Sequence, residues 1–398
     1  MTQRVYRTRL VGSVAEVDAR AWDTLLERQP SPTPFMSHAY LRALEEAGCA
    51  LPGTGWQPLA LLLEDGDGLA AATPLYLKSH SWGEYVFDWA WADAYRRHGL
   101  PYYPKLLGAV PFTPAPGTRL IAREASARAA LAGEVRELAR ARRLSSAHLL
   151  FVDETDRAAL ESAGWMLRSG VQFHWQQDAA APLPGFDALL ASLQRDKRKK
   201  ITQERRRVHE AGVRFECLEG EAITPRHWDF FHRCYELTYR AHGSTPYLNR
   251  AFFGALAATM PQHWLMFVAA VDGEPLAASL VAIDRGRRIA WGRHWGCTRH
   301  VPLLHFEACY YQPLEWCLLN GFVRFEGGAQ GEHKMARGLL PVQTFSAHWI
   351  ADARFAGAVD DFLAREGQGV ALYLDELRER TPFRPPAGAA SPSCPSRP

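Results

Sequence analysis

The alternation of apolar and polar residues predicts a helix followed by a β-hairpin at two places in the chain. Apolar residues recur at helical spacing over 35–44 and again over 247–256, and each segment precedes two strand-like runs joined by an Asp-Gly turn. The two turns read DGDGLAAA (65–72) and DGEPLAAS (272–279), with five of eight positions identical. A helix and a hairpin repeated in the same order predict two copies of one α/β domain.

The rest of the pattern places the boundary between the two copies near residue 165. An Ala/Arg-rich helix (124–143), a strand (146–152) and a short helix close the first domain, which we expect to span 1–165. The second domain is expected to span 166–384. The Pro/Ser/Ala-rich tail, 385–398, is predicted to be disordered because it has almost no core-forming residues.

A strongly basic helix is predicted over 187–211, at the start of the second domain. Apolar residues recur there at helical spacing, and Gly212 supplies a C-terminal stop. Residues 195–207 hold eight cations and two anions. This face is either a solvated surface or a phosphate-binding one. The candidate phosphate ligands are Lys197, Arg198, Lys199, Lys200 and Arg205.

Polar and aromatic residues are densest in the segment 289–338. The pattern predicts a strand (289–295), a helix (303–320), a second strand (322–326) and a glycine-rich loop (327–338). Pro313 lies inside the predicted helix, so we expect a kink there.

The glycine-rich loop carries five polar side chains within eight positions, which a packed core does not need. Glycine lets the backbone approach a ligand closely. A His or Glu can take a proton from an attacking amine, and a Lys or Arg can stabilise an oxyanion or a phosphate. We therefore expect His333 or Glu332 to act as base and Lys334 and Arg337 to stabilise charge, with Gln330 binding substrate.

His305, on the preceding helix, is a further catalytic candidate. The equal alternative is that His305 only makes a hydrogen bond within the structure. Arg293 and His294 are expected to bind substrate.

No metal site is expected. His305 and Glu307 lie two residues apart on the predicted helix and so point in different directions, and no HExxH motif occurs. Metal-dependent hydrolysis is therefore the least favoured function. The seven cysteines include no CxxC pair, and we expect reduced thiols.

The first domain contributes a second set of candidates. Residues 91–120 contain five prolines and three glycines, which preclude a regular helix and predict a shaped loop. This loop either binds the acceptor or packs the domains together. Its candidate ligands are Trp91, Asp93, Tyr102, Tyr103 and Lys105. The predicted strand 170–176 has one apolar and one polar face, so Gln172 and His174 either line a cleft or face solvent.

Composition sets the broad class. Hydrophobic residues make up 47% of the 398 residues, which excludes disorder for the bulk of the chain. The 46 Lys+Arg and 43 Asp+Glu give a net charge of +3, so any attraction to phosphate must come from a local patch. No apolar run approaches 18 residues and the N-terminus has no apolar signal region, so we expect a cytoplasmic protein without integral membrane association.

Several long strings resemble a bacterial FemAB-like family of GNAT-type N-acyltransferases. They include YYPKLLGAVPFTPAPGTRL, GVQFHW, RDKRKKITQERRRV, LHFEACYYQPLEW and FEGGAQGEHKMARGLLPV. The resemblance implies an α/β fold of two tandem GNAT-like domains, each a mixed sheet with flanking helices. It implies transfer of an acyl or aminoacyl group to an amine, such as that of a peptidoglycan precursor. It also implies that Lys334 stabilises the reacting carbonyl and that the basic helix faces charged tRNA.

The resemblance leaves the donor open between acyl-CoA and aminoacyl-tRNA, and an acyl carrier protein is a further possible donor. Acetyl-CoA-dependent GNATs carry an Arg/Gln-x-x-Gly-x-Gly/Ala loop that holds the pyrophosphate at a helix N-terminus. Here Arg293-x-x-Gly296 begins the pattern, but Thr298 stands where Gly or Ala is expected. The acceptor is expected to be a small molecule or a cell-wall precursor. The alternative to an enzyme is a non-catalytic GNAT-like module that binds a cell-wall precursor or RNA.

Overall fold

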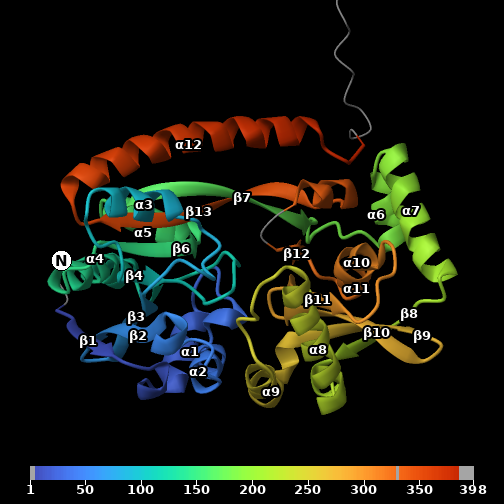
Figure 1. Cartoon of the computed structure of the whole chain (residues 1–398), viewed down its shortest axis with the longest axis horizontal. Helices are drawn as coiled ribbons and strands as arrows, with labels where there is room; N and C mark the ends of the chain where they lie inside the picture. Colours follow the sequence, from blue (N-terminus) through green and yellow to red (C-terminus); the bar gives the residue numbers. More distant parts are fainter. Residues whose placement is uncertain (1–4, 329–330, 385–398) are drawn as a thin grey trace, which may run out of the picture.

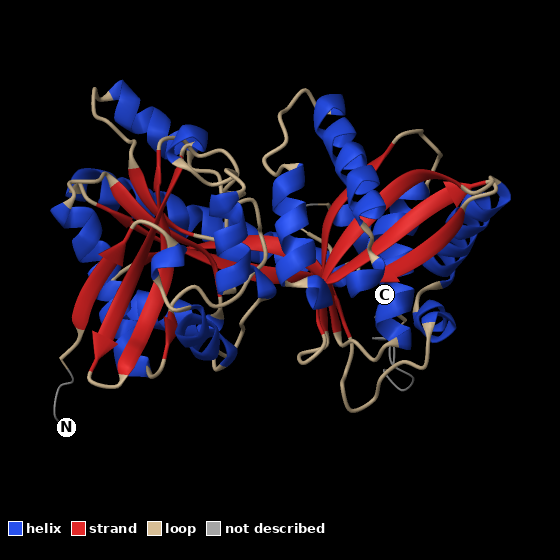
Figure 2. Ribbon diagram, turned by 90° about the horizontal axis from the view of Figure 1, so that it is seen from below, coloured by secondary structure: helices blue, strands red, loops and turns tan. Residues whose placement is uncertain are grey.

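A continuous mixed sheet of 13 strands runs through both halves of the chain. The computed structural model describes residues 5–328 and 331–384. The strands lie in the order β1-β2-β3-β4-β6-β13-β7-β12-β11-β10-β9-β8, and β5 pairs with β3. Figure 2 shows the two lobes that this sheet joins.

The first half contributes the elements up to residue 162. Its strands are β1 (Arg7–Val11), β2 (Trp56–Asp65), β3 (Gly68–Lys78), β4 (Lys105–Gly108), β5 (Ile121–Ala122) and β6 (Ser146–Val152). Its helices are α1 (Ala19–Glu27), α2 (His38–Glu46), α3 (Trp89–Arg97), α4 (Ala125–Ala141) and α5 (Glu154–Ser162).

The second half contributes the remaining elements. Its strands are β7 (Met166–Gln176), β8 (Arg214–Glu219), β9 (Trp264–Val271), β10 (Glu274–Asp284), β11 (Ile289–Cys297), β12 (Arg324–Glu326) and β13 (Leu340–Ile350). Its α-helices are α6 (Phe186–Ser192), α7 (Arg195–Glu210), α8 (Pro225–Ala241), α9 (Arg250–Thr259), α10 (Leu304–Phe306), α11 (Gln312–Leu319) and α12 (Ala353–Glu379). A π-helical turn, η6 (Glu307–Tyr311), joins α10 to α11, and a 3-10 helix, η7 (Glu332–Arg337), precedes β13.

The strand order is symmetric about its centre, as the internal repeat predicts. Counted from the two ends, β1 matches β8, β2 matches β9, β3 matches β10, β4 matches β11 and β6 matches β12. Both Asp-Gly turns form the predicted hairpins, β2–β3 and β9–β10. In each half the matched inner pair, β4–β6 and β11–β12, is parallel. The fold is therefore α/β, with two tandem domains of matching strand order.

Strands β7 and β13 lie at the centre of the sheet and join the two halves. Strand β7 pairs with β12 and β13, and β13 pairs with β6 of the first half. Helix α12 then packs along β7 and β13, as the long red helix of Figure 1 shows. On another face, the largest buried cluster combines side chains of α1 and α2 with those of α8 and α9.

The basic segment differs from its prediction. The sequence predicts one helix over 187–211, whereas the structure has α6 and α7, separated at Leu193 and Gln194. There Leu193 forms a β-bridge with Phe383, and the Gln194 N–H donates to the Pro382 carbonyl at 2.8 Å. These tertiary bonds replace the helical ones. The predicted tail, 385–398, and Gln330 lie outside the described residues.

Candidate functional site

A cavity of about 140 Å³ lies where strands β11 and β12 part. The two strands pair at three positions, ending with Trp291 opposite Glu326. The next residues on each side, Gly292 on β11 and Gly327 after β12, both line the cavity. A break in pairing between parallel strands thus opens a space with backbone on two sides. The other lining residues are Ser279, Leu280, Val281, Arg293, His294, Trp295, His305, Cys309, Tyr310 and Gly328.

The π-helical turn that supplies Cys309 and Tyr310, and that follows His305 of α10, is explained by Pro313. Proline has no N–H, so it cannot donate to a carbonyl in the preceding turn. The Gln312 N–H donates to Glu307, and the Ala308 carbonyl instead accepts from the Ser279 hydroxyl at 2.6 Å. The predicted kink at Pro313 is therefore a π-bulge, which occurs often at functional sites.

Lys334 lies against the glycine wall of the cavity. It is buried, and its Nζ donates to the Gly328 carbonyl at 3.0 Å. A β-carbon at Gly327 would lie 3.3 Å from Lys334 Cδ and 2.6 Å from Leu339 Cδ2, so a larger residue here would require the Leu339 side chain to shift. Burial lowers the pKa of Lys334 to about 8. The ammonium is thus positioned beside the space where a carbonyl oxygen could sit.

Two of the predicted histidines lie beside this lysine. Burial lowers the pKa of His305 to about 4, and His333, Arg337 and Lys334 lower it further. Burial and the same cations, Arg337 and Lys334, lower the pKa of His333. The His333 ring shares a hydrogen bond of 3.3 Å with the Tyr310 hydroxyl. Both imidazoles are therefore neutral at pH 7 and can accept a proton.

Arg337 and Glu332 lie on the same turn but make other contacts. Arg337 is buried, forms an ion pair of 2.9 Å with Glu204 of α7, and stacks over Phe306 at 3.5 Å. Glu332 is exposed and accepts a 2.6 Å hydrogen bond from Tyr373 of α12. Glu332 does not line the cavity, and Arg337 holds the loop against α7.

Arg293 connects the cavity to the first half. Its guanidinium donates to the Phe112 carbonyl at 3.0 Å and to the Thr113 hydroxyl at 2.9 Å. His294 packs edge-on against Tyr235, and burial lowers its pKa. Nearby on β7, Gln172 donates to the Pro114 carbonyl at 2.7 Å. The segment around residue 113 therefore bonds to the second half at two places.

Gln172 and His174 are buried, so neither faces solvent. The His174 ring bonds to the Gln172 side-chain oxygen at 3.1 Å, and burial lowers its pKa to about 3. Glu326, also buried, lies opposite His174 in the sheet, and burial raises its pKa to about 7. Gln172 also lines a separate hollow of about 240 Å³, whereas His174 lines neither that hollow nor the cavity.

The matching cleft of the first half is closed. Beyond the β4–β6 pairing, Gly117 lies beside Val152 of β6 and donates its N–H to the Phe151 carbonyl at 3.0 Å. The buried Arg119 guanidinium fills the adjoining space, donating to four carbonyls, those of Ala115, Gly117, Thr118 and Leu150, at 2.5–3.4 Å. The two halves thus differ in the described residues. The space beyond the β4–β6 pairing is filled, whereas the space beyond the β11–β12 pairing is open.

The basic helix α7 has an exposed face and a buried face. Arg195, Arg198, Lys199, Thr202, Gln203 and Arg206 line a surface hollow of about 410 Å³. Lys200 is exposed, and Lys197 pairs with Asp196 at 2.9 Å. Arg205 points inward instead, to Glu307 at 3.1 Å and Glu315 at 2.6 Å. Those two carboxylates, rather than a phosphate, neutralise Arg205.

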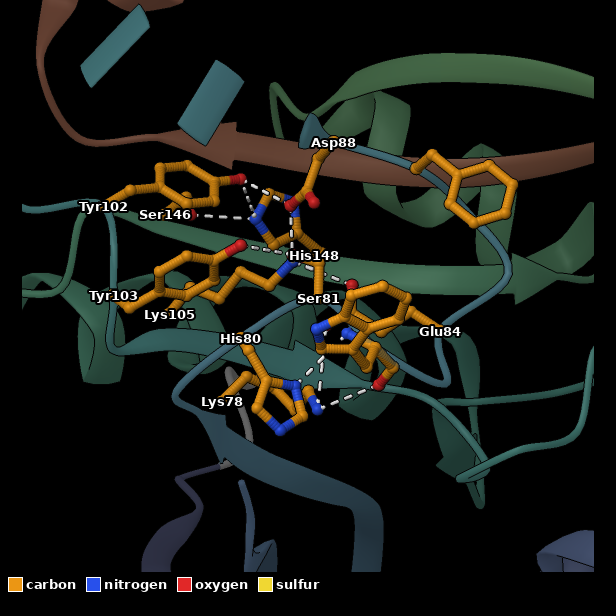
Figure 3. A network of polar contacts seen from close by, with 12 residues as sticks. Lys78, His80, Ser81, Glu84, Asp88, Tyr102, Tyr103, Lys105, Ser146 and His148 are labelled. Atoms are coloured by element: carbon orange, nitrogen blue, oxygen red, sulfur yellow. Dashed lines mark hydrogen bonds and ion pairs between the residues drawn. The ribbon is translucent and has the colours of Figure 1, made fainter. Parts of the chain in front are cut away.

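Of the first-domain candidates, Tyr102, Tyr103 and Lys105 belong to a polar network with Ser81 and Asp88 (Figure 3). Lys105 is buried and donates to Ser81 at 2.8 Å, to Glu84 at 2.7 Å and to Asp88. Tyr102 also donates to Asp88, at 2.6 Å, and Trp91 is buried. Tyr103 bonds to Ser81 through its hydroxyl, and Asp93 pairs with Arg96 and Arg97 on the surface. Trp91, Tyr102 and Lys105 are thus core residues.

The sequence missed Ser279 and Arg119. In the internal repeat, Ser279 occupies the position that Ala72 has in the first copy. A polar residue in one copy, where the other copy has alanine, was the signal that could have identified Ser279.

Within residues 5–328 and 331–384, no group of three His, Cys, Asp or Glu side chains is placed to bind a metal ion. No helix of the described chain is long and apolar enough to cross a membrane.

Solved structures share this architecture across most of the chain. FemX aligns with a TM-score of 0.54 and 10% identity, covering 88% of this chain and 100% of that one. The C-terminal domain of a putative lysylphosphatidylglycerol synthetase from Agrobacterium fabrum aligns at 0.53 and 12%, covering 88% and 97%. L-PGS from Bacillus licheniformis aligns at 0.53 and 10%, covering 88% and 96%. At these identities the likeness is one of fold.

The sequence itself identifies the family. A family model described as peptidoglycan biosynthesis/recognition matches residues 13–385, and the chain belongs to this FemAB-like family. No curated protein matches the sequence. Family and fold together point to an acyl- or aminoacyl-transferase.

Proposed function

We propose that this protein is an N-acyltransferase that moves an aminoacyl or acyl group onto an amine of a peptidoglycan precursor, in the cavity between β11 and β12. The observation that carries the proposal is the convergence of a buried ammonium, two neutral imidazoles and a glycine-lined backbone at one strand splay. A backbone-lined space suits a bound carbonyl, and the flanking groups suit proton removal and charge stabilisation.

Each group has a role in the reaction. The acceptor amine attacks the carbonyl carbon of the donor ester or thioester, and its proton passes to His305 or His333. The charge that develops on the carbonyl oxygen is stabilised by Lys334. The intermediate then collapses, the carbon–oxygen or carbon–sulfur bond breaks, and the leaving hydroxyl or thiol takes the proton back.

Aminoacyl-tRNA is the donor we favour over acyl-CoA. The exposed face of α7 presents Arg195, Arg198, Lys199 and Arg206, an arrangement typical of phosphate-backbone binding. The buried face of the same helix holds Arg337 through Glu204, so a polyanion on α7 would lie directly outside the helix that supports the site loop. Acyl-CoA remains the alternative donor, with Thr298 in place of the small residue of the pyrophosphate loop.

A transfer assay tests the proposal. The purified protein is mixed with a muramyl-pentapeptide precursor that has a free amine, and with either aminoacyl-tRNA or acyl-CoA, and the product is followed by mass spectrometry. Lys334→Met should lower kcat by about 10²–10³, as the loss of one oxyanion donor does elsewhere. Glu332→Gln, on the same turn but outside the cavity, should stay near wild type. Absence of transfer from either donor, or full turnover by Lys334→Met, would show the proposal to be wrong.

A further inference from the structure

Three aromatic side chains are exposed on one short segment of the first half. Trp82, Phe87 and Trp89 are 59%, 52% and 39% exposed, and we call them the aromatic platform. The rings of Trp82 and Trp89 meet with centroids 5.1 Å apart at an angle of 61°. Single exposed apolar residues such as Leu372 are ordinary, but three aromatic ones within eight positions mark a binding surface.

Buried charges hold the backbone of this segment in place. Lys105 binds Ser81, Glu84 and Asp88 from beneath, as the dashed lines of Figure 3 show. Lys105 and its three partners are all buried. Burying these charges costs free energy, and a surface loop without a role would not need such a network. The network thus fixes the segment between the exposed rings.

The backbone of the platform residues is anchored as well. Lys78, also buried, donates to the Trp82 carbonyl at 3.3 Å, and Arg168 of β7 donates to the Phe87 carbonyl at 2.6 Å. Between them Tyr85 has φ of 63°, a left-handed conformation that is strained for a residue with a bulky side chain. Such strain persists where the surroundings over-determine the backbone, and it concentrates at ligand-binding segments.

We propose that the aromatic platform binds sugar rings of the peptidoglycan acceptor, an inference that rests on the proposed function for the class of acceptor. A saturated sugar ring has a face of C–H groups that packs against an indole. Tryptophan offers a large rigid surface at low cost in conformational entropy. Two indoles at an angle provide a shaped support for adjoining rings, and the family's description as peptidoglycan recognition agrees with this ligand.

The charges beside the platform suit a sugar better than a membrane. Trp89, Asp93 and Arg96 are spaced to share one face of α3. Asp93 is paired with both Arg96 and Arg97, so this edge carries a net charge of only about +1. Anionic lipid surfaces are bound by clusters of about four to eight basic residues. A nearly neutral edge with one carboxylate and two guanidinium groups can instead hydrogen-bond to sugar hydroxyls.

The same segment reaches toward the reaction cavity. Burial raises the pKa of Tyr85, which Tyr239 raises further and Arg293 lowers, so the three side chains are neighbours. Arg293 lines the cavity. A ligand with its sugar on the platform would therefore lie on the segment that leads to the transfer site.

Isothermal titration with two soluble probes tests the inference. The probes are a GlcNAc–MurNAc-tetrapeptide and the same tetrapeptide without sugars. The wild type should bind the sugar-bearing probe more tightly. The double variant Trp82→Ala/Trp89→Ala should lose about tenfold or more in affinity for that probe, with no change for the free peptide. Leu372→Ala, at a still more exposed apolar residue on α12, is the control and should bind like the wild type.

Three outcomes separate the claims. Unchanged affinity of the double variant for the sugar-bearing probe, with an unchanged melting temperature, would overturn the inference. So would a loss confined to binding of phosphatidylglycerol–phosphatidylcholine vesicles, because it would assign the platform to a membrane surface. Lys334→Met should keep the wild-type affinity for both probes, so a failure of transfer chemistry is seen separately from a failure of sugar binding.

Discussion

The Ser279 hydroxyl donates to the Ala308 carbonyl at 2.6 Å and thereby joins strand β10 to the π-helical turn beside the cavity. Pro313 cannot donate to this carbonyl, so the serine supplies the missing hydrogen bond. Both groups are buried. The position of His305, Cys309 and Tyr310 around the cavity therefore depends on a residue from another element.

Ser279→Ala should lower the free energy of unfolding by about 1–3 kcal/mol, because it leaves the Ala308 carbonyl buried without a partner. Denaturant unfolding measures the change. Ser244→Ala removes an exposed serine that also bonds to a carbonyl, at 3.3 Å, and should change stability by less than about 0.5 kcal/mol. Equal effects of the two substitutions would contradict the role of Ser279.

After correction for protonation of the acceptor amine, the pH profile of transfer should be flat between pH 5 and 7 and should fall as pH rises through about 8. Burial lowers the pKa of His305 to about 4 and also lowers that of His333, so His305 is already deprotonated across the lower range. Burial lowers the pKa of Lys334 to about 8, so the stabilising charge is lost above that pH. Measurement of kcat/KM against pH checks both limbs.

Lys334→Arg provides the control for the alkaline limb, because a guanidinium stays charged to much higher pH. Whatever activity the variant retains should show no decline near pH 8. A decline at the same pH in both proteins would assign the alkaline limb to another group.

Removing cations from the exposed face of α7 should weaken the salt dependence of RNA binding. Each phosphate contact contributes about 0.7–0.9 to the slope of log Kobs against log salt concentration. Arg198→Ala/Lys199→Ala should therefore reduce the slope for tRNA by about 1.4–1.8. Arg240→Ala removes an exposed cation of α8 and should leave the slope unchanged. Identical slopes for all three proteins would exclude this face as the RNA-binding surface.

The closed cleft of the first half predicts one donor per chain. Calorimetric titration with a non-hydrolysable donor analogue should give a stoichiometry of one donor per chain, and a value of two would contradict this prediction.

Arg119→Met should lower the free energy of unfolding by about 3–5 kcal/mol, because the guanidinium donates to four carbonyls and lies near the buried Asp156. Arg123→Met, at a partly exposed ion pair, should cost no more than about 1 kcal/mol.

Candidate catalytic residues beside the cavity could be recognised from the sequence because they lie close together in the segment 305–334. His333 and Lys334 lie beside the open cavity together with His305, as the polar loop and the preceding helix suggested. Trp91, Tyr102 and Lys105 also formed a dense polar–aromatic stretch, yet they are buried under the platform. A pattern of residue types does not show whether the Lys105 ammonium is exposed to solvent or is buried against Glu84 and Asp88.

The sequence by itself determined the local elements: both hairpins, the helices before them and the strands around the glycine-rich loop. Hydrophobic periodicity and turn residues act between residues that are close in the chain, so the sequence alone predicts the elements they form. Only the tertiary structure decided which groups meet. Ser279 of β10 bonds to Ala308 of the π-helical turn, 29 positions away, and His148 bonds to His348, 200 positions away, because β13 pairs with β6 of the first half. Burial and hydrogen-bond partners arise from such contacts between segments distant in the chain, and no local pattern encodes them.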